Sequence, residues 1–342
     1  MLILTGIYGV ARGGSERAAL RIVKAWRRLG HEVEMVGEQD GGRTRPLGLA
    51  ADLVRRAARN RPDILFAPGQ TYAIPFGIAA RRIGVPLVSK ISNLPARPRA
   101  NGPDAVWLRW QAQWTAAFVA PDAAAAALLH EIMGIPKATI ATIANPAADA
   151  DRLQKLHAAC PAPPGGGPLR LLAAGRLVLQ KNFSMLISAF ASVAQRHDTL
   201  TILGEGPMRA RLERRAVACG CNIRLPGHID DPAAQFAAAN AFALSSNTEG
   251  LPAVLIEALA TGLPIAATRA TPGLADLIDA ETGILVAKND RVAMSTAIED
   301  LRSFQPNRET AFETALRFTA DAAAPDYISL FSTLAFKQKS RD

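Results

Sequence analysis

Short apolar runs alternate with longer amphipathic segments along the whole chain, and this pattern constrains the fold more than any other feature. Strands buried on both faces of a parallel sheet become continuously apolar, whereas the helices that cover them stay amphipathic. The alternation therefore predicts strand–helix units on parallel sheets, a doubly wound α/β fold. The six strands expected in the first half cover residues 2–8, 32–37, 64–67, 86–91, 117–120 and 139–143.

A dense cluster of proline and glycine at residues 161–168 separates two series of such units. The cluster is typical of a linker, and 342 residues exceed what one compact core usually supports. We therefore predict two Rossmann-like domains facing each other across a cleft, with ligands at the carboxyl ends of the strands. The expected parts are a first domain at 1–160, the linker, a second domain at 169–320 and a terminal helix at 321–342.

The second half repeats the architecture of the first without repeating its sequence. The terminal segment has Tyr327, Phe331 and Leu334 at helical spacing, so we expect it to pack as an amphipathic helix. The six strands expected in the second half cover residues 169–174, 200–203, 223–225, 242–244, 264–267 and 284–286.

Composition indicates an ordered protein of a reducing compartment. Hydrophobic residues make up 49% of the chain and charged residues 20%, whereas disordered chains are poorer in apolar residues. Cys160, Cys219 and Cys221 are too few for a disulfide framework and lack the spacing of a zinc site. The apolar opening has no basic region before it, so we interpret it as a strand and not as a signal peptide. No apolar run reaches the length of a membrane span, and we expect a cytoplasmic protein.

Positive charge is concentrated in the first half. The net charge is +9, and residues 1–150 hold 19 lysines and arginines against 11 acidic residues. This excess suits an anionic membrane surface or an acidic acceptor, with a solvated face as the alternative. Nucleic acid is not expected, because the basic residues are not interleaved with aromatics. Trp107, Trp110 and Trp114 have helical spacing, and they form either an interfacial surface at the membrane or part of the core.

Two glycines after the first strand open a helix. Gly13 and Gly14 allow close approach of the backbone, and Ser15 can cap the helix. The free N–H groups of the first turn would then form an anion site. A tight turn is the alternative, because the spacings of dinucleotide-binding and P-loop motifs are both absent.

Arg176 and Lys181 place two cations after the first strand of the second half. Both stand at the end of a strand or the start of a helix, so we expect them to point into the cleft beside free N–H groups. Two fixed cations hold a diphosphate and stabilise it as a leaving group. Ordinary surface charge is the alternative.

Two turn-forming loops follow the next two strands, at residues 204–207 and 225–228. Gly204, Glu205 and Gly227 can present backbone groups to a base or a ribose at the edge of the cleft. We interpret His228 as an ordinary loop histidine.

The most informative stretch runs from Glu249 to Glu257. Pro252 suits the first turn of a helix, so Glu249 precedes that helix. The N–H groups near Gly250 and Leu251 would form an anion site beside it. Two carboxylates about two turns apart can grip one hydroxyl-rich ligand at two places. In the alternative, the first glutamate caps the helix and the second is an ordinary exposed residue.

With these residues in place, the chain resembles the retaining glycosyltransferases of family 4, which have the GT-B fold. The resemblance runs over nearly the whole chain, and its segments are specific in combination. Residues 249–257 match the Glu-x7-Glu motif of the family. The other matching segments are residues 13–17, 29–33, 144–146, 175–177, 180–183, 204–207 and 225–227.

The resemblance implies a role for the matching residues. Gly14, Arg176 and Lys181 would hold the diphosphate of a nucleotide-sugar donor. Glu249 would contact the sugar and Glu257 the ribose. The resemblance also implies no cofactor and no obligatory metal, because protein cations replace it. Transfer would retain the anomeric configuration without a protein nucleophile, so Glu249 is not assigned as one.

The chain departs from the family in the loop after its fourth strand. Many relatives have a histidine there, near the 6-position of the donor sugar, where this chain has Ser92 and Asn93. Either residue replaces the contact, or the donor sugar differs at that position, or activity is reduced.

We therefore expect a transferase that moves a sugar from a nucleoside-diphosphate sugar to a glycan or lipid-linked acceptor in bacterial-type surface polysaccharide synthesis. The basic first domain would hold the acceptor at the inner face of a membrane. Two other functions stay open: a nucleotide-sugar epimerase of similar shape, and a non-catalytic protein that binds sugar nucleotides or glycans.

Overall fold

A computed structural model describes residues 1–7, 14–37, 46–91, 99–160 and 167–340. The chain folds into two compact units, one of Met1–Asp149 with Phe318–Asp342 and one of Ala150–Arg317. These bounds differ from the predicted domains at both places where the chain passes from one unit to the other. The helix that begins at residue 150 packs in the second unit, and the terminal helix packs in the first. A helix joins the unit whose core buries its apolar face, which a linker composition does not show.

The first unit is built on a parallel sheet of six strands in the order β2-β1-β3-β4-β5-β6. All six predicted strands are confirmed. The three strands β3, β4 and β5 are buried at every position, which explains why β3 and β5 are continuously apolar, whereas β4 ends in the buried polar residues Ser89 and Lys90. The strands are β1 (Leu2–Gly6), β2 (Glu32–Val36), β3 (Ile64–Ala67), β4 (Leu87–Lys90), β5 (Ala117–Ala120) and β6 (Ile140–Thr142).

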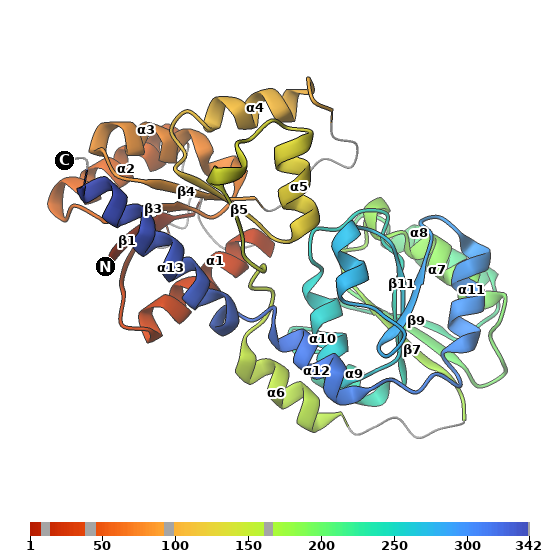
Figure 1. Cartoon of the computed structure of the whole chain (residues 1–342). Helices are drawn as coiled ribbons and strands as arrows, with labels where there is room; N and C mark the ends of the chain where they lie inside the picture. Colours follow the sequence, from red (N-terminus) through yellow and green to blue (C-terminus); the bar gives the residue numbers. More distant parts are fainter. Residues whose placement is uncertain (8–13, 38–45, 92–98, 161–166, 341–342) are drawn as a thin grey trace. The chain divides into compact units, whose positions relative to one another are not determined.

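The last helix of the chain, α13 (Ala320–Lys339), completes the core of this unit and lies along α1, close to the N-terminus (Figure 1). Its Tyr327 and Phe331 are buried against Trp26 and Phe66, with ring centroids 5.2 Å apart for Trp26 and Phe331. The other helices of the unit are α1 (Gly14–Arg28), α2 (Pro46–Arg59), α3 (Ala73–Ile83), α4 (Pro103–Gln111) and α5 (Ala123–Glu131).

The second unit has its own six-stranded parallel sheet, in the order β12-β11-β10-β7-β8-β9. Its strands confirm the second predicted series, and with them the α/β class with two Rossmann-like sheets. The strands are β7 (Arg170–Ala174), β8 (Thr199–Leu203), β9 (Ile223–Gly227), β10 (Ala241–Leu244), β11 (Ile265–Thr268) and β12 (Gly283–Val286).

Helices α7 and α11 contribute Leu186, Phe190 and Ile298 to the main core of this unit, where they pack against Leu171 and Ile202 of the sheet. Across the described residues, no helix is long and apolar enough to cross a lipid bilayer. The helices of the unit are α6 (Ala150–Ala159), α7 (Phe183–Ala191), α8 (Arg209–Ala218), α9 (Ala233–Ala238), α10 (Ala253–Thr261), α11 (Arg291–Asp300) and α12 (Arg308–Leu316).

Candidate functional site

The strand order of the second sheet determines where a ligand can bind. From the central strand β7 the chain moves outward through β8 and β9, and then returns to the other side of β7 through β10, β11 and β12. The loops after β7 and β10 therefore diverge, and doubly wound sheets bind ligands at the carboxyl ends of such a strand pair. The loop after β7 carries Arg176 and Lys181, and the loop after β10 carries Glu249.

Glycines let the loops at this edge approach one another closely. Gly204 has a φ of +131°, and a Cβ at this position would lie 2.0 Å from the carbonyl oxygen of Gly175. The Gly204 N–H donates to the carbonyl of Gly227 at 2.7 Å, and the Leu177 N–H donates to the carbonyl of Glu205 at 2.8 Å. The loops after β7, β8 and β9 thus form one hydrogen-bonded edge, in which Gly204 cannot carry a side chain.

An ion pair joins the loop after β7 to the loop after β10. The Lys181 ammonium donates to Oε1 of Glu249, and the same oxygen accepts from Oγ of Ser246 at 2.6 Å. The side chains of Lys181 and Glu249 are only 14% and 8% exposed. Each charge is therefore largely withdrawn from water and depends on the other for compensation. Both residues were predicted to face the cleft, but their direct contact was not predicted.

Backbone contacts support this ion pair. The Asn247 N–H donates to the carbonyl of Gln180 at 2.8 Å, and Nε2 of Gln180 donates to the carbonyl of Thr248 at 2.6 Å. Oγ of Ser245 donates to the carbonyl of Lys181 at 2.8 Å. These bonds connect the two loops on either side of the charged pair, so its geometry is set by the backbone as well as by side chains.

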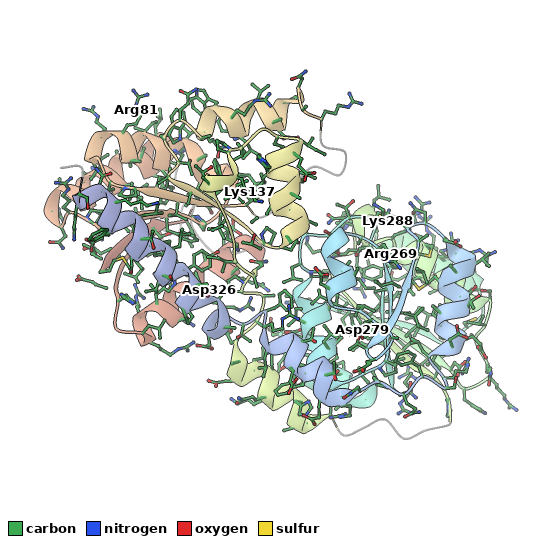
Figure 2. The ribbon with its side chains drawn as sticks, in the orientation of Figure 1. Arg81, Lys137, Arg269, Asp279, Lys288 and Asp326 are labelled. Atoms are coloured by element: carbon green, nitrogen blue, oxygen red, sulfur yellow. The ribbon has the colours of Figure 1, made fainter. Side chains whose placement is uncertain are left out.

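Three exposed cations lie along the same edge. Arg176 follows β7. Arg269 and Lys288, both labelled in Figure 2, follow β11 and β12, which are neighbours of each other in the sheet. The three side chains make no hydrogen bond or ion pair with the part of the chain that the structure describes. The edge thus offers uncompensated positive charge to an anion, and sequence reasoning had found only Arg176 and Lys181.

Helix α10 presents the second glutamate of the motif. Pro252 is its N-cap residue and forms no side-chain cap, so the first N–H groups of the helix have no capping side chain. Glu257 is held from another helix, because Nε of Arg152 in α6 donates to its Oε1 at 2.8 Å. Thr261, one turn further along α10, is fully buried.

The remaining predicted residues of the second unit gather around Gly227. A Cβ at Gly227 would lie 2.8 Å from Oε1 of Glu205, which means that the Glu205 carboxylate covers the glycine. Arg209 donates to Glu205 at 2.7 Å and to the carbonyl of Leu225 at 2.7 Å. His228 is exposed and its only described charged neighbour is Asp230, at 3.3 Å. The loop histidine therefore has no environment that would tune it for catalysis.

The first unit contributes less that can be described. Gly14 is the first residue of α1, as expected for a helix start after β1. Gly13, Ser92 and Asn93 lie outside the described residues. Lys90, the last residue of β4, is 4% exposed and donates to Oδ1 of Asn145. Its burial, with no acidic partner within the described ranges, lowers the pKa of the ammonium to about 8.

Trp107, Trp110 and Trp114 form one cluster of rings in the first unit. Trp110 of α4 is 41% exposed and stacks on Trp107 at 5.0 Å between ring centroids. Trp114 meets Trp110 edge to face at 4.1 Å, and its indole lies over Gly77 of α3. Trp110 is thus exposed, whereas Trp107 and Trp114 are half-buried and Trp114 packs against the core, so the cluster is partly core and partly surface.

A metal site is not apparent in the described ranges, where no three His, Cys, Asp or Glu side chains are grouped in a way that could hold an ion. The groups that the structure describes at the edge of the second sheet are cations, carboxylates and the first N–H groups of α10.

Arg152, Ser246, Arg269 and Lys288 were missed by sequence reasoning. Ser246 stands three residues before Glu249, at a spacing that could have suggested a capping contact. Arg152 is 105 residues from Glu257 in the sequence. A local sequence pattern cannot predict their contact, because it is formed only by the packing of α6 on α10.

Two family models match the chain, one in each unit. The model described as "Glycosyltransferase Family 4" matches residues 12–150, and the model described as "Glycosyl transferases group 1" matches residues 168–303. The second match includes every charged residue of the edge described above except Arg152.

Named relatives align with parts of the chain. The lipopolysaccharide core biosynthesis glycosyltransferase LpsE of Rhizobium meliloti is 30% identical over 177 residues, which are 50% of this chain and 51% of LpsE. An α-1,4-N-acetyl-D-galactosaminyltransferase of Campylobacter jejuni, which acts on an undecaprenol-linked glycan, is 32% identical over 133 residues, 38% of this chain and 37% of that protein. The match spans about half the length of the first relative and less of the second.

Solved structures share the fold over nearly the full length. HepE from Anabaena, in complex with UDP, has 18% identity and a TM-score of 0.74, with 97% of this chain and all of that chain covered. The lipopolysaccharide outer core galactosyltransferase WaaB, in its apo form, has 17% identity and a TM-score of 0.75, with 98% of this chain and all of that chain covered.

Proposed function

The chain belongs to the group 1 glycosyltransferases of family 4, and from this membership we propose that it transfers a sugar from a nucleoside-diphosphate sugar to a glycan or lipid-linked acceptor. The observation that carries the proposal is the Lys181–Glu249 pair at the carboxyl edge of the second sheet, between β7 and β10. In this pair, the ammonium that we assign to the diphosphate contacts the carboxylate that we assign to the sugar.

The leaving diphosphate is the group that needs most stabilisation. Arg176 has its donors free among the described residues, and Lys181 has three ammonium donors, of which Glu249 takes one. Together with the uncapped N–H groups of α10, these cations neutralise negative charge as the glycosidic bond to the phosphate breaks. We propose that they supply the charge a metal ion provides in other enzymes.

The two glutamates bind hydroxyl groups of the donor. Oε1 of Glu249 accepts from Lys181 and Ser246, and its Oε2 makes no hydrogen bond within the described ranges. That oxygen is available to a sugar hydroxyl, while the paired oxygen is a poor nucleophile because two donors already hold it. We propose that Glu257 accepts from the ribose and that transfer retains the anomeric configuration. Gly204, Glu205 and Gly227 would face the base.

The nature of the acceptor is suggested by the relatives. LpsE is named for lipopolysaccharide core biosynthesis, and the Campylobacter jejuni relative for a glycan on undecaprenol diphosphate. We propose an acceptor of the same class, a surface glycan or its lipid-linked precursor, held by the first unit.

An anionic membrane is the surface on which such an acceptor would be met. Ile74 and Ile78 of α3, both more than a third exposed, flank Gly77, over which Trp114 lies. With Trp107 and Trp110 they form what we call the tryptophan surface. Arg81, at the end of α3, adds positive charge beside it (Figure 2). Exposed indoles next to arginine suit the interface of an anionic bilayer.

A screen of nucleotide sugars by thermal shift tests the donor proposal. A bound donor raises the midpoint of unfolding by mass action, so at least one member of a panel of UDP-, GDP- and dTDP-sugars should do so. The shift should be reduced in Glu257→Gln and kept in Lys155→Met, a variant of an exposed lysine of α6. No shift with any donor would contradict the proposal.

A second assay distinguishes the other functions. Incubation with the selected nucleotide sugar, without an acceptor, should leave that sugar unchanged. Its conversion to another sugar would indicate an epimerase. Binding without release of nucleoside diphosphate, even with glycan acceptors present, would indicate a non-catalytic binding protein.

A further inference from the structure

Arg152 is placed against the second glutamate of the motif by the packing of α6 on α10. It lies in the first turn of α6, and its Nε donates to Oε1 of Glu257 at 2.8 Å. The side chains of Arg152 and Glu257 are 31% and 16% exposed. The pair is therefore shielded enough from water to hold a defined geometry.

The guanidinium also reaches a second loop of the same edge. A terminal nitrogen, Nη1, lies 3.6 Å from Oδ1 of Asp231, in the loop between β9 and α9. Asp231 in turn accepts from the Ala233 N–H at 3.3 Å, at the start of α9. Arg152 thus lies between the helix that carries Glu257 and the loop that follows Gly227.

One oxygen of Glu257 stays open. Within the described ranges its Oε2 has no hydrogen-bond partner, while Oε1 is occupied by Arg152. A glutamate side chain has three rotatable bonds, and an unrestrained carboxylate would have to be ordered when a ligand binds. Occupation of one oxygen by a planar guanidinium fixes the direction in which the other oxygen accepts.

We propose that Arg152 is a positioning residue for nucleotide binding, which holds the carboxylate of Glu257 so that its free oxygen accepts from a hydroxyl of the donor's ribose. The inference rests on the proposed function, because it concerns how Glu257 meets that ribose. Arg152 itself does not touch the reacting atoms. Its effect passes through Glu257, and this dependence can be measured.

Isothermal titration of the full-length protein with UDP, and separately with GDP, gives the first test. Arg152→Met should raise the dissociation constant of the preferred nucleotide about tenfold, which corresponds to about 1.4 kcal/mol. Arg152→Lys should recover only part of this, because an ammonium compensates the charge without the planar geometry of the guanidinium. Lys155→Met removes a cation from the same helix, one turn further on, and should bind as the wild type does.

A double-mutant cycle separates positioning from a general structural role. In a Glu257→Gln background, the further change Arg152→Met should alter the dissociation constant by less than about twofold, since the group it positions is already changed. A structural role would instead weaken binding by the same factor in both backgrounds. The thermal midpoints of the four proteins, measured alongside, report whether each one folds.

The outcomes separate this inference from the function on which it rests. Failure of the wild-type protein to bind either nucleotide would overturn both. Binding by the wild type with equal affinity in Arg152→Met, or an undiminished effect of Arg152→Met in the Glu257→Gln background, would overturn the role of Arg152 alone.

Discussion

At the scale of single residues, the carboxyl edge of the second sheet pairs each motif glutamate with a cation. Glu249 is held by Lys181, and Glu257 by Arg152. Such pairing compensates the charge of a carboxylate that is largely withdrawn from water. In the function that we propose, a diphosphate would share Lys181 with Glu249, and donor binding would be coupled to the position of the carboxylate that we assign to the sugar.

Replacement of Lys181 tests this coupling. Lys181→Met removes a donor from the diphosphate and leaves Glu249 with Ser246 as its described side-chain partner. We expect kcat to fall by about 100-fold, the usual cost of one donor to a developing negative charge. Steady-state kinetics with the preferred donor measure this. Lys181→Arg should retain more activity than Lys181→Met, and equal turnover in all three proteins would contradict the assignment.

Lys90 predicts a pH-dependent stability of the first unit. Its pKa is lowered to about 8 by burial, from an ordinary value near 10.5. Below pH 8 the ammonium is charged in both states and the folded protein bears the full cost of burying it. Between about pH 8 and 10.5 the unfolded chain binds more protons, so the free energy of unfolding rises with pH. The whole change is roughly 3 kcal/mol.

The measurement compares Lys90→Met with the wild type by urea unfolding at pH 7 and pH 10. Lys90→Met should be the more stable protein at pH 7, and most of its advantage should disappear at pH 10. Lys137→Met, an exposed lysine of the same unit (Figure 2), should show no such difference. An advantage that is the same at both pH values would contradict the burial of a charged ammonium.

The positions and contacts of the site residues could be predicted from the sequence to different extents. Lys181 and Glu249 were each predicted to face the cleft, because loops after parallel strands share the carboxyl edge of a sheet, but their contact with each other was not predicted. Arg152 was not predicted at all, because its contact with Glu257 depends on how α6 packs. The burial of Lys90 was equally hidden, since a lysine at the end of a strand is exposed in most proteins.

At the scale of elements, α13 links the end of the chain to the core of the first unit. Tyr327 and Phe331 fill the space beside Trp26 and Phe66, from more than 250 residues further along the sequence. Rings in edge-to-face contact contribute beyond the area they bury. The first unit therefore depends on a helix that is synthesised after the whole second unit.

Truncation of Phe331 measures this dependence. Phe331→Ala should cost about 3–5 kcal/mol of the free energy of unfolding, because a fully buried ring is replaced by a cavity. Phe336→Ala, at a 73% exposed position of the same helix, should cost almost nothing. In Phe331→Ala, amide hydrogen exchange measured by mass spectrometry should speed up, relative to the wild type, more in β1 and β3 than in β7 and β8. Similar losses in both variants would contradict the packing described.

The tryptophan surface of α3 and α4 predicts binding to anionic bilayers. Trp110→Glu should reduce binding to vesicles that contain phosphatidylglycerol at least fivefold, through lost apolar contact and added repulsion. Val217→Glu changes a more exposed apolar residue in the second unit and should leave binding unchanged. Co-sedimentation measures both, and equal loss in the two variants would assign the attraction to net charge alone.

Elements were the best-predicted level of the structure. All twelve strands were expected from short runs rich in apolar residues, and the strands buried at every position, such as β3 and β5, show this pattern most clearly. The sequence did not predict the unit to which α6 and α13 belong. An amphipathic helix shows that it has a buried face, but not which core that face packs against.

At the scale of the whole molecule, the chain joins two Rossmann-like units and is a member of a family of glycosyltransferases. The fold alone does not decide the reaction, since one fold hosts many chemistries. The reaction is argued instead from the charges at one edge of the second sheet, and from relatives that the chain matches in part.

Transfer of a labelled sugar tests the central claim most directly. The protein is incubated with its preferred donor, 13C-labelled in the sugar, and with lipid-linked glycans extracted from the cells that make it, and the products are followed by nuclear magnetic resonance. We predict that nucleoside diphosphate is released only when the glycans are present, and that the label enters them with the anomeric configuration of the donor. Label that stays on the nucleotide, as the same sugar or as an epimer, would contradict the account.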